Sequence, residues 1–153
     1  MRIVGLVGKK EFTEISDYFL SKDVEMIIMD PMRVFGKDHI TSAMEHARRS
    51  FRNGTNRSKT VITEFLLYMA GERQISRALD AMKPKKGSIS FVVVFPDGVD
   101  DDIIDNLGMK RDDSLITGTE EKAIAMGLSK NGLDVLYDDL VLEMVAMADV
   151  LKN

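Results

Sequence analysis

The residues best suited to binding chemistry lie near the centre of the chain, around a break at Gly71 between two apolar helical patterns. Arginine and lysine bind phosphates, amide side chains can reach base edges, and an apolar side chain can support an unstacked base. Such residues form two sets: Asn56, Arg57, Ser58 and Lys59 before the first helical pattern, and Arg73, Gln74, Ile75 and Arg77 after it. If the two sets converge, they predict a site for the short single-stranded end of a nucleic acid.

The charge distribution supports a site for a polyanion, although the whole chain carries a net charge of −4. Residues 37–86 contain eleven Lys or Arg against five Asp or Glu, while the remainder contains ten against twenty. A basic centre between acidic flanks is compatible with a face that binds RNA. The alternative, that the charges mix once the chain folds, stays open.

A structural role is the alternative for Arg73, which could cap a helix or form a salt bridge with Glu72 or Glu64. The chain has no tryptophan and few aromatic residues, which argues against a long stacking platform. An end of a few nucleotides therefore fits the sequence better than a duplex or a long strand.

Other chemistry has little support in the sequence. The absence of cysteine excludes thiolate zinc sites and cysteine nucleophiles. His39 and His46 lie about 10 Å apart on one predicted helix, too far to share a metal, and we expect both to be exposed. The acidic runs at 100–102 and 112–113 lack the calcium-loop pattern and predict a solvated face. We expect a binding protein without catalytic residues, metal or cofactor.

The second hypothesis is a stand-alone enzyme or small-ligand protein with a pocket near Gly5–Lys9. Gly5 and Gly8 follow an apolar run, as the glycines of phosphate loops do, but the spacing matches neither dinucleotide nor P-loop motifs. A third hypothesis is a structural dimer that buries the apolar C-terminal helix against its own copy.

The hydrophobic patterns predict the elements that would position these residues. Strands are expected at 2–7, 24–30 and 88–95, and helices at 11–22, 38–51, 58–71, 72–82, 100–108, 118–127 and 133–151. This order predicts a single α/β domain over residues 1–153, with a small mixed sheet covered by about six helices. The N-terminal apolar run is too short for a signal peptide or a membrane span, so we expect a cytoplasmic protein.

The stretch from Asn56 to Leu79 carries a family resemblance. It contains the run Leu-Leu-Tyr-Met-Ala-Gly-Glu-Arg-Gln-Ile at 66–75, and the strand at 88–95 follows it. This block resembles the small KEOPS-complex subunit that binds the PRPK/Bud-type kinase, the TPRKB-like or CGI-type family, in its archaeal form. The likeness extends to the helix at 38–53 and, more loosely, to the C-terminal helix.

The resemblance implies a non-catalytic subunit. KEOPS places a threonylcarbamoyl group on the adenosine beside the tRNA anticodon, and its transferase subunit performs the chemistry. The similar family binds and activates the small kinase-like ATPase and captures the 3′ CCA end of tRNA, so it supports the transferase indirectly. By this resemblance the two sets above become candidates for tRNA contact. The candidates for kinase contact are Leu140, Met144, Val145 and Met147.

Overall fold

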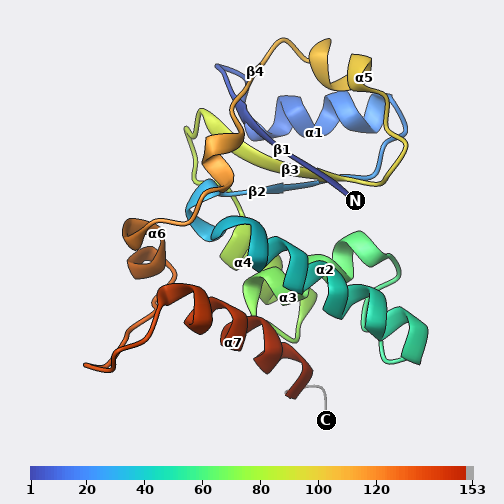
Figure 1. Ribbon diagram of the computed structural model, residues 1–153. Coiled ribbons are helices and arrows are strands. Elements are labelled where there is room, and N and C mark those ends of the chain that lie inside the picture. The colour runs from blue at the N-terminus through green and yellow to red at the C-terminus, as the bar shows by residue number, and fades with distance from the viewer. Residues whose placement is uncertain (151–153) are drawn as a thin grey trace.

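The computed structural model describes residues 1–150 and contains an antiparallel sheet (Figure 1). Its strands are β1 (Arg2–Val7), β2 (Ile27–Met29), β3 (Ser90–Phe95) and β4 (Lys110–Arg111), in the spatial order β2-β3-β1-β4. The predicted α/β class is confirmed, but the expectation of a mixed sheet is wrong, because each pair in this sheet is antiparallel. Sequence patterns define where a strand lies and not the direction in which it meets its neighbour.

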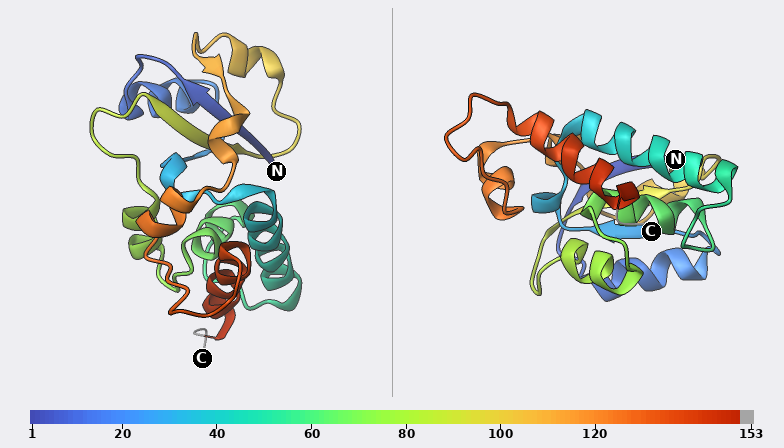
Figure 2. Two further views of the ribbon diagram at one scale, coloured as in Figure 1. Left: turned by 60° about the vertical axis from the view of Figure 1, so that its left-hand side comes forward. Right: turned by 90° about the horizontal axis from the view of Figure 1, so that it is seen from below.

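The sheet is covered on both faces, which explains the uninterrupted apolar run of β3. Successive side chains of a strand point to opposite faces. Val92 and Val94 accordingly join the core beneath one helical layer, while Val93 and Phe95 join the core on the other face. The second face is covered by two helices, α1 (Phe12–Ser21) and α5 (Asp101–Asp105). Figure 2 shows the resulting layers, with α1 and α5 on one side of the strands and the larger helical layer on the other.

The larger layer is built around one buried helix. It contains α2 (Gly36–Asn53), α3 (Val61–Ala70), α4 (Ile75–Met82) and α7 (Tyr137–Val150). The apolar residues of α3 extend round the helix, and α2, α4 and α7 pack against it. The short helix α6 (Glu120–Ala125) and the 3₁₀ turns η1 (Pro31–Arg33) and η2 (Asp113–Ile116) complete the described part.

Two glycines end the helices that matter for the site, and the predicted break at Gly71 is a helix end. Gly54 and Gly71 adopt left-handed backbone angles, with φ of +66° and +65°, and close α2 and α3 respectively. The predicted helix starts at residue 58, whereas α3 begins at Val61. Its cap is Thr60, whose hydroxyl accepts a hydrogen bond from the backbone N–H of Thr63.

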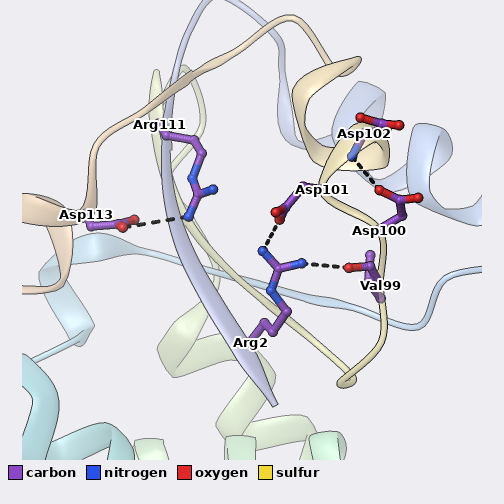
Figure 3. Close-up of polar contacts among 7 residues, drawn as sticks. All are labelled: Arg2, Val99, Asp100, Asp101, Asp102, Arg111 and Asp113. Carbon is purple, nitrogen blue, oxygen red and sulfur yellow. Dashed lines mark hydrogen bonds and ion pairs between the residues drawn. The ribbon is translucent and has the colours of Figure 1, made fainter.

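The acidic runs are largely exposed, as the prediction of a solvated face requires, and they also make structural contacts (Figure 3). Asp100 accepts a hydrogen bond from the backbone N–H of Asp102 at 3.0 Å and so caps α5, and Asp101 pairs with Arg2. Asp113 accepts from the backbone N–H of Gly5 and lies 3.8 Å from Arg111. No group of acidic and histidine residues in the described range is arranged to hold a metal ion. Within residues 1–150, every helix is too short or too polar to cross a membrane.

Candidate functional site

The set at 73–77 lies in the turn between α3 and α4, and its polar side chains point to no protein partner. Arg73, Gln74 and Arg77 are exposed, and none has a hydrogen bond or ion pair within the described residues. Gln74 caps α4 with an extended backbone but makes no side-chain cap bond, so the first N–H groups of α4 stay available. Ile75 is half-buried against the main core. This turn therefore offers cationic and amide groups to a ligand on a fixed support.

The structural alternative for Arg73 is not seen. Glu64, one of the two carboxylates considered for it, is fully buried and accepts hydrogen bonds from the backbone N–H groups of Arg57 and Ser58, at 3.0 and 3.1 Å. Glu72, the other, forms no ion pair with Arg73 in the described structure.

Backbone geometry holds the 73–77 set in place. The N–H groups of Gly71 and Glu72 return to the carbonyl oxygens of Tyr68 and Leu67, at 3.2 and 3.0 Å, and close α3. The α-carbon of Gly71 then lies directly against Met144 of α7. The turn is thus positioned by the end of the buried helix α3 and the middle of α7.

The set at 56–59 is mostly used to build the entry into α3. The Asn56 amide donates to the carbonyl oxygen of Ser58 at 2.9 Å, and Ser58 is 4% exposed. An Arg57 guanidinium nitrogen lies 3.5 Å from the carbonyl oxygen of Ala148. Ser58 Oγ and Arg57 Nη1 are buried without a hydrogen-bond partner in the described residues. Lys59 alone of this set is exposed without a polar contact there.

The expected convergence of the two sets is wrong. They lie at opposite ends of α3, a helix of ten residues and therefore about 15 Å long. Because α2, α4 and α7 pack against α3, the two sets are separated by the length of this helix. The sequence pattern showed that both sets flank the helix but not that the helix separates them.

Helix α7 is anchored by a polar cluster at its C-terminal end. Asp149 accepts a hydrogen bond from the hydroxyl of Tyr68 and pairs with His46 Nδ1, each at 2.5 Å, and Tyr68 also contacts Ser50 Oγ at 2.7 Å. His46 is therefore half-buried and hydrogen-bonded to Asp149, not a free surface histidine as expected. The cluster joins α2, α3 and α7.

The candidates for kinase contact on α7 divide between core and surface. Val145 is fully buried in the main core and is not accessible to a partner. Leu140 and Met144 are half-buried, and Met147 is 43% exposed. Sequence analysis did not name Leu136 and Val150, both 64% exposed, which lie at helical spacing from Leu140 and Met147. The 3.6-residue periodicity of this stripe is the signal that would have identified them.

His39 is buried, not exposed as expected. The backbone N–H of Phe35 donates to Nδ1 at 2.9 Å, so Nε2 carries the hydrogen and donates to the carbonyl oxygen of Met69 at 3.0 Å. Burial lowers the pKa of His39 from 6.5 to about 4; the bond to Met69 opposes this shift and the nearby Lys122 adds to it. The neutral ring ties the start of α2 to the end of α3.

Close packing explains why glycine occupies positions 5 and 8, the two glycines on which the small-ligand hypothesis rests. A Cβ atom on Gly5 would lie 2.0 Å from the carbonyl oxygen of Asp112, and one on Gly8 would lie 3.1 Å from Met109 Cγ. The backbone N–H of Asp112 also donates to the carbonyl oxygen of Gly5 at 2.8 Å. Protein atoms fill the space beside these glycines, so the hypothesis of a pocket near Gly5–Lys9 gains no support from them.

Comparison with models of protein families identifies the family of the chain. The model of the family described as "Kinase binding protein CGI-121" matches residues 8–131, well over half of the chain. No curated protein matches the chain in sequence. The matched range contains both basic sets and ends before α7 begins.

Proposed function

Because the chain belongs to the CGI-121 family of kinase-binding proteins, we propose that it is the non-catalytic KEOPS subunit that binds and activates the small Bud/PRPK-type kinase and recruits tRNA through its 3′ CCA end. In this role it supports threonylcarbamoyl-adenosine modification, acts on the transferase subunit only indirectly, and requires no cofactor. The proposal for tRNA rests on one observation, the exposed and unpartnered polar groups of the 73–77 set.

The 73–77 set has the chemistry that a short RNA end requires. Arg73 and Arg77 supply two positive charges, and the free N–H groups and dipole at the start of α4 favour a phosphate between them. The Gln74 amide can donate to and accept from a base edge, and Ile75 offers an apolar contact to its face. Lys59 belongs to a separate basic region at the other end of α3 and would contact more distant phosphates.

The kinase contact is proposed for the outer side of α7. Leu140, Met144 and Met147 remain candidates, joined by Leu136 and Val150, because these apolar side chains retain exposed surface. Val145 is not a candidate for kinase contact, since it is buried in the core. Because Gly71 lies against Met144, a kinase-binding surface here would adjoin the 73–77 set, and one chain would hold the kinase and the RNA end side by side.

Binding of the intact chain to tRNA with and without its CCA end tests the proposal. We expect removal of the CCA end to weaken binding at least tenfold, and Arg73→Glu to weaken binding of intact tRNA to the same degree at unchanged melting temperature. Lys59→Glu is the matched charge reversal in the other basic region. It should reduce affinity less and should leave the difference between intact and tailless tRNA in place. Equal binding of the wild-type chain to both tRNAs would refute CCA recognition.

A further inference from the structure

Strand β2 leaves one side of the sheet open. It is the last strand in the spatial order and pairs only with β3, from Ile27 opposite Val94 to Met29 opposite Val92. In an antiparallel ladder, alternate residues turn their N–H and C=O groups away from the partner strand. Within the described residues, no hydrogen bond outside the β2–β3 ladder involves Ile27, Ile28 or Met29. The edge is closed at its C-terminal end, where the backbone N–H of Asp30 donates to the carbonyl oxygen of Met82 at 2.8 Å. Before that point, the edge can pair with a further extended strand.

A mainly apolar cavity of about 190 Å³, whose lining also includes Asp80 and Lys83, lies against this edge, between α1 and α4. Ile27, Ile28 and Leu66 line it from the sheet and α3, and Phe12 and Leu79 line it from the two flanking helices. Phe12 is 36% exposed and Leu79 is 50% exposed, although Ile28 and Leu66 beside them are buried. Large apolar side chains exposed on both walls of a cavity are typical of a surface that binds a partner.

A second cavity, of about 450 Å³, continues from the first, since Phe12 and Lys83 line both. It is lined by three lysines, Lys83, Lys85 and Lys86, and by a single carboxylate, that of Glu11. The three lysines are exposed and have no ion pair or side-chain hydrogen bond in the described part of the chain. In a chain of net charge −4, this cavity is locally positive and complements carboxylates.

We propose that the two cavities and the edge of β2 form one groove, the β2 groove, which binds an extended acidic segment of a partner polypeptide. The segment adds a strand to β2, places an apolar side chain between Phe12 and Leu79, and sets its carboxylates against Lys85 and Lys86. A nucleic acid would use the lysines but would leave the apolar walls and the open backbone edge without a partner. The groove goes beyond the proposed function and is distinct from both the 73–77 set and the outer side of α7.

Titration of the full chain with synthetic nine-residue peptides tests this assignment. The first peptide alternates Val and Thr and ends in three Glu, the second ends in three Lys, and the third repeats the first with N-methylated backbone in its apolar half. We expect the first to bind, and the other two to bind at least tenfold more weakly. The backbone amide of β2 that faces the open edge should exchange with solvent more slowly in the complex.

Variants on each wall of the groove give the decisive comparison. Leu79→Asp and Lys86→Glu should each weaken the acidic peptide at least tenfold, and Lys37→Glu, an exposed lysine outside the groove, should not. Both groove variants should retain binding to kinase and tRNA. The assignment is overturned if no peptide binds, if binding is indifferent to these variants, or if amide exchange in β2 is unchanged. It is also overturned if Lys86→Glu weakens an oligonucleotide instead of the peptide.

Discussion

Gly71 lies directly against Met144: a Cβ atom at position 71 would come within 2.6 Å of Met144 Cγ and 3.0 Å of the Met144 carbonyl oxygen. Atoms that are not bonded to each other do not approach that closely, so only glycine at position 71 lets the α3–α4 turn and α7 meet here. The contact sets the distance between the proposed RNA-binding residues and the proposed kinase-binding surface.

Gly71→Ala should therefore destabilise the chain strongly. A left-handed backbone costs a residue with a side chain about 1–2 kcal/mol, and overpacking against Met144 adds about 1–3 kcal/mol. Gly54→Ala is the matched control, because Gly54 has nearly the same φ but a Cβ atom there would meet nothing within 4 Å. We expect urea unfolding to show a loss of only about 1–2 kcal/mol for that variant. Equal losses at the two positions would contradict the contact with Met144.

Met147→Asp should weaken kinase binding at least tenfold without changing the melting temperature. Met147 is 43% exposed on the outer side of α7, so a carboxylate there remains hydrated in the free chain but would be desolvated in an apolar interface. Ile124→Asp on α6 is the control, since Ile124 is also an exposed apolar residue, at 63%. Titration of each variant with the kinase measures the effect. If Ile124→Asp lost the kinase and Met147→Asp did not, the contact would lie outside α7.

Ser58→Ala should leave tRNA affinity unchanged and should maintain or raise stability by about 1 kcal/mol. The Ser58 hydroxyl is buried without a hydrogen-bond partner in the described structure, and removing such a group relieves an unpaired polar atom. The backbone N–H of Ser58 still donates to Glu64 in the variant. Urea unfolding and tRNA titration measure the two quantities. A tenfold loss of tRNA affinity would restore Ser58 as an RNA contact.

The buried His39 should make the chain less stable in mild acid. Its pKa is about 4 in the folded chain and 6.5 in the unfolded chain, so the unfolded state binds a proton first as the pH falls. Stability is then fully present above pH 6.5 and falls by about 3 kcal/mol as the pH drops from 6.5 to 4. Urea unfolding at several pH values should show a shallower decline for His39→Gln. An NMR titration that placed the His39 pKa near 6.5 in the folded chain would contradict this.

Local patterns in the sequence predicted much of the fold. The strand at 2–7 and the glycine ends of α2 and α3 follow from short-range chemistry, namely alternation, apolar runs and the backbone freedom of glycine. The strand β4 has only two exposed residues, Lys110 and Arg111, and exists through its pairing with β1, so it left no pattern to find.

The site was less predictable because it depends on contacts between distant residues. Ser58 and Thr60 are both reasonable caps in sequence; in the structure Thr60 caps α3, while the backbone N–H groups of Arg57 and Ser58 donate to the buried Glu64 carboxylate. Helix α7 is apolar around most of its circumference, so the sequence could not separate buried Val145 from exposed Met147. Residue types suited to RNA were visible in the sequence, but their separation by α3 was not.

The place of β3 in the chain has a consequence for biogenesis. It is the partner of both β1 and β2, and residues 30–89, which contain α2, α3 and α4, are translated between β2 and β3. A ribosome must therefore release the chain beyond Phe95 before the first two strands find their neighbour. Until then β1 and β2 stay unpaired. During this time, either the helices that have already folded or chaperones must protect the nascent chain against aggregation.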